Sequence, residues 1–249
     1  MKLPKMILFD YGQTLLGEGE WDNLRGNAAL LRHAVKNPRN VTAQDVAALA
    51  DELFGKTCLP VRELDRELHE WQFDRLLYEL LQVEFPFTAQ EQERVFFENA
   101  MTIEPMPHIE ELLELIREIG IRTGVVSNLI SSGMELERRI TMHFPAHKFE
   151  FIIASSEYGV RKPDPLIFQL ALAKAGLPPE DIWFCGDHPR CDVEGSHAAG
   201  MQPVWYESLD LLDPRPDPTL TAPNCPHLYI RSWRELIEIL KEPTCTTPT

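Results

Sequence analysis

The chain has 249 residues, which is long enough for one large α/β domain or for a core domain with a smaller inserted one. Apolar residues make up 44% of the sequence and charged residues 25%, an ordinary globular composition that excludes a fibrous or disordered chain. Its 39 acidic and 24 basic side chains give a formal charge of −15, which repels polyanions and argues against nucleic acid as a partner.

The first predicted strand is the apolar run from Met6 to Phe9, which ends in Asp10 and is soon followed by Gly12. A short apolar run that stops at a polar residue is typical of a buried parallel strand that ends in a loop. The same run is too short for a signal peptide or a membrane span, so we expect no association with a membrane.

Only helical patterns are found in residues 17–100, directly after this strand. Two of these helices, the second and the fourth in chain order, open at a threonine with an acid three residues on, as in a capping box. The predicted helices run from Leu24 to Val35 and from Val61 to Val83, and two more open at Thr42 with Asp45 and at Thr88 with Glu91. The sequence therefore predicts a helical insertion at this point.

Strands and helices alternate from about residue 105 onward, which is typical of a doubly wound parallel sheet. The predicted strands are Ile121 to Val126, Phe149 to Ala154, Ile182 to Cys185 and Pro203 to Tyr206. The helices among them are Ile109 to Ile119 and Leu166 to Ala175, the second with Asp164 as N-cap, Pro165 at its first position and Gly176 at its end. Ligands of such sheets bind at the carboxyl ends of the strands, where polar residues collect in this chain.

The last segment contains a proline-rich connection at residues 208–226, a short strand from Leu228 to Ile230 and an amphipathic helix through Leu240. Ser232 and Glu235 form the expected capping box of that helix. The cysteines show no disulfide-type or metal-type spacing, which favours reduced thiols and a cytoplasmic location. They are Cys58, Cys185, Cys191, Cys225 and Cys245.

Four polar segments at the ends of strands or in loops carry the candidate chemistry. In chain order they are Asp10 in an Asp-x-x-x-Thr-Leu frame, Ser127, Lys162 in Arg-Lys-Pro-Asp-Pro, and Gly186-Asp187 followed by Asp192. Their order and contexts resemble the motifs of the haloacid dehalogenase-like hydrolase superfamily, over nearly the whole chain. The resemblance implies a Rossmann-like core of residues 1–16 and 101–249 with a helical cap of residues 17–100. It also implies magnesium-dependent hydrolysis of a small phosphorylated molecule.

A carboxylate that attacks a phosphorus atom already surrounded by negative charge needs cations beside it. Asp10 is the candidate nucleophile, Lys162 supplies one positive charge, and Ser127 can donate a hydrogen bond to the phosphoryl oxygens. Mg²⁺ supplies two further charges, and oxygen atoms are its preferred ligands. The expected ligands are Asp10, the carbonyl group of Gly12, Asp187, and Asp192 as an additional or outer ligand. The resemblance implies these same roles.

Each of these residues also has an ordinary structural interpretation. Asp10 can begin a turn, Lys162 can be a solvated loop charge, and Ser127 can cap the helix that follows it. Asp187 and Asp192 can be acids at a helix start, where the helix dipole favours them. Their joint occurrence in this order favours the chemical interpretation.

The chain departs from the family's phosphatases two residues after the nucleophile, where a second aspartate usually exchanges protons with the leaving group and with water. The residue here is Gly12, and the next position, usually glycine, is Gln13. Loss of general acid–base help typically lowers a rate by about 10²–10⁴, which predicts a slow phosphatase. His33 and His69 in the helical insertion are candidate proton donors in its place.

Three other interpretations follow from the same departure. The substrate can have a leaving group that needs little protonation, such as an acyl phosphate, or the protein can bind a phosphorylated ligand without hydrolysing it. A 2-haloacid dehalogenase is the third, because those relatives also lack the second aspartate. They work without a metal, however, and replace the acid that this chain keeps as Asp187. For the assembly we expect a monomer or a homodimer.

Overall fold

The computed structural model describes residues 2–208 and 221–242. Its main sheet has six strands in the order β5-β4-β1-β6-β7-β8, and every neighbouring pair is parallel. The strands are β1 Met6–Phe9, β4 Arg122–Ser127, β5 Ile152–Ala154, β6 Ile182–Gly186, β7 Gln202–Tyr206 and β8 Leu228–Ile230. The predicted Rossmann-like parallel sheet is thus confirmed, although β5 is shorter than the predicted segment.

Helices cover both faces of this sheet, as a doubly wound fold requires. Alternate residues of β1 point to opposite faces of the sheet. Ile7 and Phe9 pack against the helices on one face, and Met6 and Leu8 pack against the helices on the other face. The first face is covered by α6 Ile109–Glu118, α7 Gly133–His143 and α11 Trp233–Lys241, the second by α9 Pro165–Ala175 with α10 Gly195–Ala198 beside it. Burial on both sides explains why β1 is apolar throughout instead of alternating.

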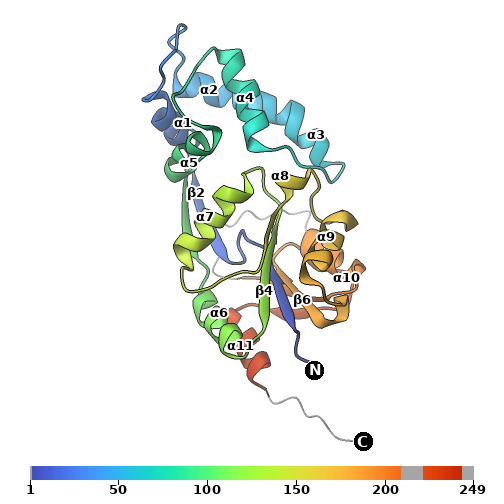
Figure 1. Cartoon of the computed structure of the whole chain (residues 1–249). Helices are drawn as coiled ribbons and strands as arrows, with labels where there is room; N and C mark the ends of the chain where they lie inside the picture. Colours follow the sequence, from blue (N-terminus) through green and yellow to red (C-terminus); the bar gives the residue numbers. More distant parts are fainter. Residues whose placement is uncertain (1, 209–220, 243–249) are drawn as a thin grey trace, which may run out of the picture.

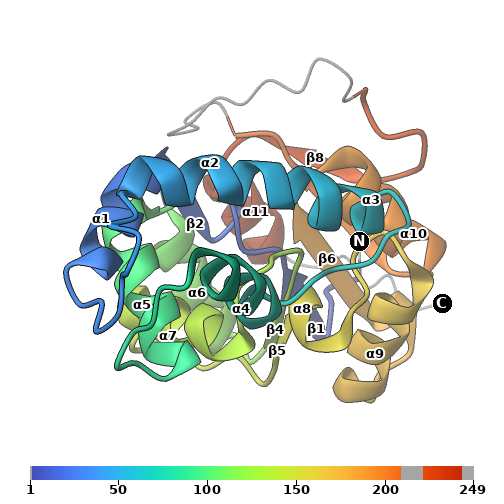
Figure 2. The ribbon, with the colours of Figure 1, turned by 90° about the horizontal axis from the view of Figure 1, so that it is seen from above.

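A second body of helices, the helical layer, stands over the carboxyl ends of the strands (Figure 1). It has a hydrophobic core of its own, to which Leu30, Val46, Phe73 and Leu77 contribute. Its helices are α1 Asn23–Leu31, α2 Ala43–Leu53, α3 Leu59–Arg62, α4 Glu70–Leu81 and α5 Ala89–Ala100. Seen from above, α2 runs across the molecule, whereas α4 is seen nearly end-on (Figure 2). Short helical turns complete the fold at α8 Ser155–Tyr158, Phe54–Cys58, Pro179–Asp181 and Pro189–Glu194.

Two expectations for residues 17–100 are wrong. Strand β2 Leu16–Trp21 pairs antiparallel with β3 Met101–Pro105, so the segment is not helical throughout. The sequence hid β2 because it carries two glycines and its pairing partner lies some 80 residues away. The predicted helix from Val61 to Val83 is two helices, broken where Asp65 adopts a left-handed φ of 53°. The division into core and cap at residues 16 and 101 stays a prediction.

Each residue predicted to begin a helix as its N-cap does so in the structure. The capping boxes at Thr42 and Thr88 are complete, and Asp164 caps α9. At α11, Ser232 is the N-cap but accepts from the N–H of Arg234, and the carboxylate of Glu235 accepts from the N–H of Arg231, so the predicted reciprocal box is not formed. The proline-rich connection lies for the most part outside the described residues.

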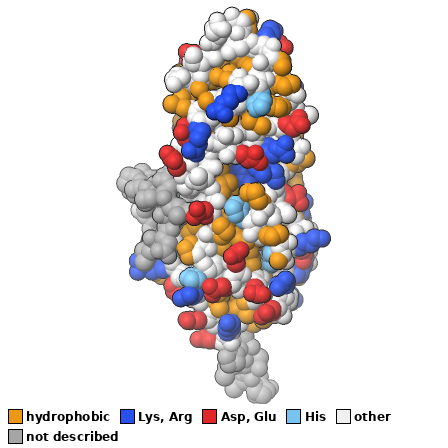
Figure 3. Space-filling view, turned by 90° about the vertical axis from the view of Figure 1, so that its left-hand side faces the viewer, with side chains coloured by type: hydrophobic (Ala, Val, Ile, Leu, Met, Phe, Trp, Pro, Cys, Tyr) orange, Lys and Arg blue, Asp and Glu red, His pale blue; other side chains and the backbone are white. Residues whose placement is uncertain are grey.

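None of the helices within the described residues combines the length and apolar character needed to cross a lipid bilayer. On the face drawn in Figure 3, acidic and basic side chains are interspersed over much of the described surface. This face therefore presents no broad surface of a single charge.

Candidate functional site

All six residues predicted to form the site line one cavity of about 370 Å³. The carboxyl ends of β1, β4 and β6 lie side by side in the sheet, and they carry Asp10, Ser127 and Asp187 there. The loop before α9 contributes Lys162, and the turn after β6 contributes Asp192. We call this space the Asp10 cavity. Gly12, which follows β1, is the sixth predicted residue on its wall.

Lys162 joins two of the carboxylates in the Asp10 cavity. Its Nζ lies 2.6 Å from Asp10 Oδ1 and 2.6 Å from Asp192 Oδ1, and only 1% of the lysine is exposed. Asn128 holds the backbone of Lys162 from both sides, since its Oδ1 accepts from the N–H at 2.7 Å and its Nδ2 donates to the carbonyl at 2.8 Å. No local sequence pattern indicates this role of Asn128. The lysine is therefore built into the fold and is not a solvated loop charge.

The ionisation of these groups reflects their burial. Burial raises the pKa of Asp10 to about 6, an effect that Lys162 opposes and Asp192 reinforces. Burial also raises the pKa of Asp187 well above its usual value, with Asp192 and Asp10 adding to the effect. For Lys162, burial lowers the pKa, but Asp10 and Asp192 outweigh it and raise the pKa overall. One ammonium thus faces three carboxylates, and negative charge is in excess.

The three carboxylates are placed to hold a metal ion. One oxygen from each of Asp10, Asp187 and Asp192 lies within 4.8 Å of the others. The backbone N–H of His188 donates to Asp192 Oδ2 at 2.9 Å, which fixes one of these groups. A set of oxygen donors with excess negative charge suits a hard divalent cation such as Mg²⁺. The residues present therefore fit the expected cofactor.

The turn after β1 brings a further carboxylate to the cavity. Gln13 adopts a left-handed φ of 55°, its N–H donates to the carbonyl of Leu16 at 2.8 Å, and its Nε2 donates to the carbonyl of Glu18 at 3.0 Å. Glu18 lies on β2 and lines the Asp10 cavity beside Gly12. Sequence reasoning missed Glu18, because its segment was expected to be part of a helical insertion.

The two histidines considered as proton donors do not line the Asp10 cavity. His69 is the N-cap of α4, where its Nδ1 accepts from the N–H of Trp71 at 3.1 Å. The ring of His33 packs against Phe87, with 5.2 Å between the ring centroids. Both have structural roles in the helical layer.

A larger cavity of about 480 Å³, the interlayer cavity, lies between the helical layer and the loop after β4. It shares Glu18, Asn128 and Leu129 with the Asp10 cavity, so the two spaces adjoin. The carboxyl groups of Glu70 and Asp74 line the interlayer cavity. Burial, reinforced by neighbouring acids, raises the pKa of Glu70 well above its usual value and the pKa of Asp74 to about 7. The arginines that line this cavity already pair with other acids, Arg62 with Glu67 and Arg139 with Glu135.

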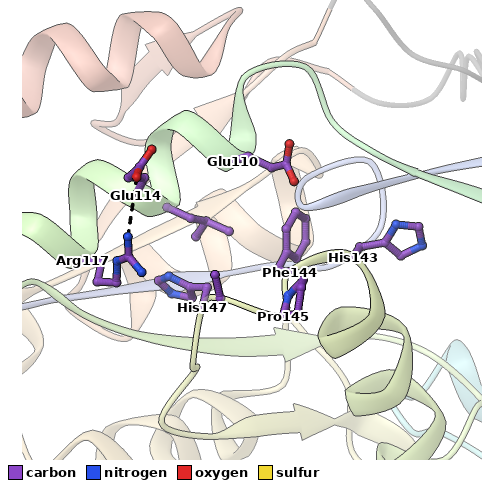
Figure 4. A pocket seen from close by; sticks show the side chains of 9 residues that line it. Glu110, Glu114, Arg117, His143, Phe144, Pro145 and His147 are labelled. Atoms are coloured by element: carbon purple, nitrogen blue, oxygen red, sulfur yellow. Dashed lines mark ion pairs between the residues drawn. The ribbon is translucent and has the colours of Figure 1, made fainter.

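Figure 4 shows a different hollow, between α6 and the end of α7, which shares no lining residue with the Asp10 cavity. Several of its polar groups are engaged locally: Arg117 pairs with Glu114 at 3.6 Å, and His147 Nε2 lies 2.9 Å from Thr123 Oγ1. Burial lowers the pKa of both His143 and His147, so neither ring favours its charged form. This hollow has no arrangement comparable to the three carboxylates and lysine.

A haloacid dehalogenase-like hydrolase model matches residues 4–200. Phosphoserine phosphatase of Thermus thermophilus is 30% identical over 146 residues, which are 58% of either chain. Glyceraldehyde 3-phosphate phosphatase of Methanopyrus kandleri is 32% identical over 143 residues, 56% of this chain and 58% of that one. The chain thus matches little more than half the length of these relatives.

The fold is similar to that of a solved 2-haloacid dehalogenase from Pseudomonas syringae. The TM-score is 0.61 at 21% sequence identity, over 96% of this chain and 98% of the other. At this identity the likeness concerns the fold alone. The family match, by contrast, extends from before β1 to the end of α10 and so includes all the motif residues. On that evidence the chain belongs to the haloacid dehalogenase-like hydrolases.

Proposed function

We propose that the protein is a magnesium-dependent phosphatase that acts on a small phosphorylated metabolite, with Asp10 as the nucleophile. The observation that carries the proposal is the buried lysine, Lys162, whose Nζ lies 2.6 Å from both Asp10 and Asp192 beside the carboxylate of Asp187. A structural ion pair needs one acid, whereas this site gathers three. The names of the phosphatase relatives point to the same class of substrate.

In this proposal Asp10 attacks the phosphorus atom and carries the phosphoryl group as an aspartyl phosphate until water removes it. Lys162 binds the phosphoryl oxygens and offsets their charge, while Ser127 donates a hydrogen bond to them. Mg²⁺, held by Asp10, the Gly12 carbonyl, Asp187 and Asp192, would supply the remaining positive charge when bound. The surplus of carboxylates in the cavity is the reason that a cation is required.

Residues 17–100 would act as the cap over a core of residues 1–16 and 101–249. The phosphoryl group occupies the Asp10 cavity, and the rest of the substrate extends into the interlayer cavity that adjoins it. Exclusion of water by the helical layer would protect the reaction and strengthen its electrostatics. Because Glu70 and Asp74 line the interlayer cavity, we expect substrates without a second anionic group there.

The test is release of inorganic phosphate from a panel of small phosphomonoesters, with Mg²⁺ and with a chelator. We expect Mg²⁺-stimulated release that Asp10→Asn abolishes. No stimulated release by the wild type, with Asp10→Asn indistinguishable from it, would overturn the proposal.

Gly12 favours one other candidate, a protein that binds phosphorylated ligands without turnover. That alternative requires a phosphorylated compound to raise the melting temperature while no phosphate is released. Release of halide from short 2-haloacids in the absence of metal would identify a dehalogenase instead.

A further inference from the structure

The space beside Gly12 is taken by the carboxylate of another residue. A Cβ atom built on Gly12 would lie 3.6 Å from Glu18 Oε2, 3.7 Å from Glu18 Cδ and 3.9 Å from Glu18 Oε1. These are ordinary van der Waals distances. The Glu18 carboxylate therefore stands where a side chain at position 12 would extend.

The local backbone directs Glu18 to this position. Strand β2 begins at Leu16, immediately after the turn that follows Asp10, and Glu18 pairs with Ile103 of β3 in the ribbon. The Gln13 side-chain amide donates to the Glu18 carbonyl at 3.0 Å and so ties the turn to the strand. Glu20, two residues on, instead has a side chain that is 74% exposed.

Glu18 also lies at the junction of the two cavities, since it lines both of them. A phosphomonoester with its phosphoryl group beside Asp10 and its organic part in the interlayer cavity has its bridging oxygen at this junction. A carboxylic acid there is placed to protonate that oxygen, whereas Asp187 and Asp192 line only the Asp10 cavity and are expected to hold the metal with Asp10.

We propose that Glu18 is the general acid and base of this enzyme, in place of the aspartate that the family's phosphatases carry at position 12; this rests on the phosphatase function proposed above. When Asp10 attacks the phosphorus, the bond to the leaving oxygen breaks and that oxygen takes the proton of the Glu18 carboxylic acid. The Glu18 carboxylate then accepts a proton from a water molecule, and the oxygen of that water attacks the phosphorus atom of the aspartyl phosphate. Cleavage of the bond to Asp10 releases inorganic phosphate and restores both carboxyl groups.

The test compares two substrates by kcat/KM, which reports the step in which the leaving group departs. An alkyl phosphate has a poor leaving group that needs the proton, whereas p-nitrophenyl phosphate has a good one that does not. We expect Glu18→Gln to lower kcat/KM for the alkyl phosphate by about 10²–10⁴ and for p-nitrophenyl phosphate by less than about 10-fold. Glu20→Gln, the matched control on the same strand, should change neither value.

A double variant tests the position of the carboxylate directly. Gly12→Asp combined with Glu18→Gln places a carboxylate in the same space, but from position 12 instead of position 18. For the alkyl phosphate, the double variant should recover at least about a tenth of the kcat/KM that Glu18→Gln alone loses. Gly12→Asp alone would set two carboxylates in contact and is expected to bring no gain.

The proposal is overturned if Glu18→Gln keeps the wild-type ratio of the two kcat/KM values. If Asp10→Asn is still inactive in that case, the phosphatase function stands and only the role of Glu18 is wrong. A wild type that releases phosphate from neither substrate removes both proposals. Should Glu18→Gln fail to fold, Glu18→Met, which keeps the length of the side chain without an acid, is judged by the same ratio.

His188 also lines the Asp10 cavity and is the rival proton donor. A shift in the ratio caused by His188→Asn but not by Glu18→Gln would likewise overturn the proposal.

Discussion

Lys162 is a buried ammonium whose partners are two carboxylates and whose backbone is held by Asn128. Its removal leaves Asp10 and Asp192 buried together with no cation between them. We expect Lys162→Met to lower the free energy of unfolding by about 3 kcal/mol in metal-free buffer at pH 7. Urea denaturation measures this. Added Mg²⁺ should recover part of the loss, because it supplies positive charge to the same carboxylates.

The matched control is Lys36→Met. Lys36 lies 2.5 Å from Glu84, but both side chains are more than half exposed, so its loss should change the unfolding free energy by about 0–1 kcal/mol. If Lys162→Met and Lys36→Met lower the unfolding free energy equally, Lys162 does not offset the charge of a buried cluster of carboxylates.

Asp10 predicts a dependence of stability on pH. Burial raises its pKa to about 6 in the folded protein, above the value near 4 that it has when unfolded. Between these values the folded state binds a proton that the unfolded state does not, so this group's contribution to stability grows as pH falls from about 7 to about 4. We expect the metal-free wild type to gain more stability over that interval than Asp10→Asn does. Parallel pH profiles of the two proteins, measured by thermal unfolding, would rule this out.

The individual site residues could be predicted from the sequence because each directly follows a recognisable strand or lies in a short motif. Glu18 could not, since its importance depends on the space left by Gly12 and on a turn at Gln13 whose left-handed backbone usually requires glycine. Asn128 could be identified only as a capping residue. Its contact with Lys162 joins positions 34 residues apart, which no local pattern contains.

At the scale of elements, Glu93 of α5 links the helical layer to the core. It is 1% exposed, and it accepts from the N–H and the hydroxyl of Ser132 at 2.6 Å each and from Trp71 Nε1 at 2.9 Å. Ser132 is the N-cap of α7, which packs on the main sheet, whereas Trp71 lies on α4. One carboxylate thus satisfies donors from both bodies.

We expect Glu93→Ala to lower the free energy of unfolding by about 2–4 kcal/mol, because two buried donors of Ser132 and the partly buried indole N–H of Trp71 lose their acceptor. The control is Glu98→Ala on the same helix, whose side chain is 50% exposed and pairs with Arg138, and which should change stability by less than about 1 kcal/mol. Denaturant unfolding of both variants decides the matter, and a smaller effect at Glu93 than at Glu98 would refute the linking role.

The sequence predicted helices and strands well where the contacts that stabilise them join residues close together in the chain. The capping boxes at Thr42 and Thr88 involve residues three apart, and both formed as expected. The ribbon of β2 and β3 was missed because antiparallel pairing across the whole helical layer has no local signature. The break after Arg62 was missed for a related reason, since an apolar helical period continues across it while Asp65 reverses the chain.

At the scale of the whole molecule, the order of the motifs along the chain predicted that they would meet, because parallel strands place their carboxyl ends at one edge of a sheet. The interlayer cavity could not be predicted from the sequence, since its walls come from six α-helices, from β2 and β3, and from the loop after β4. Glu70 and Asp74 lie four residues apart on α4 and so share one face of that helix, but the cavity that this face lines forms only where the helical layer packs on the core.

This cavity predicts selectivity by charge. Burial and neighbouring acids disfavour the charged forms of Glu70 and Asp74; an ammonium group on the substrate would stabilise those charged forms, whereas a second anionic group would disfavour them further. Among compounds of similar size, we expect kcat/KM to be highest for phosphoethanolamine, lower for an uncharged propyl phosphate and lowest for phosphoglycolate. The range should be at least about 10-fold, equivalent to about 1.4 kcal/mol of transition-state stabilisation. The double variant Glu70→Gln/Asp74→Asn should narrow this range of kcat/KM values. Glu79→Gln, on the exposed face of the same helix, should leave the range unchanged. An order that survives in the double variant would show that these two acids do not select the substrate.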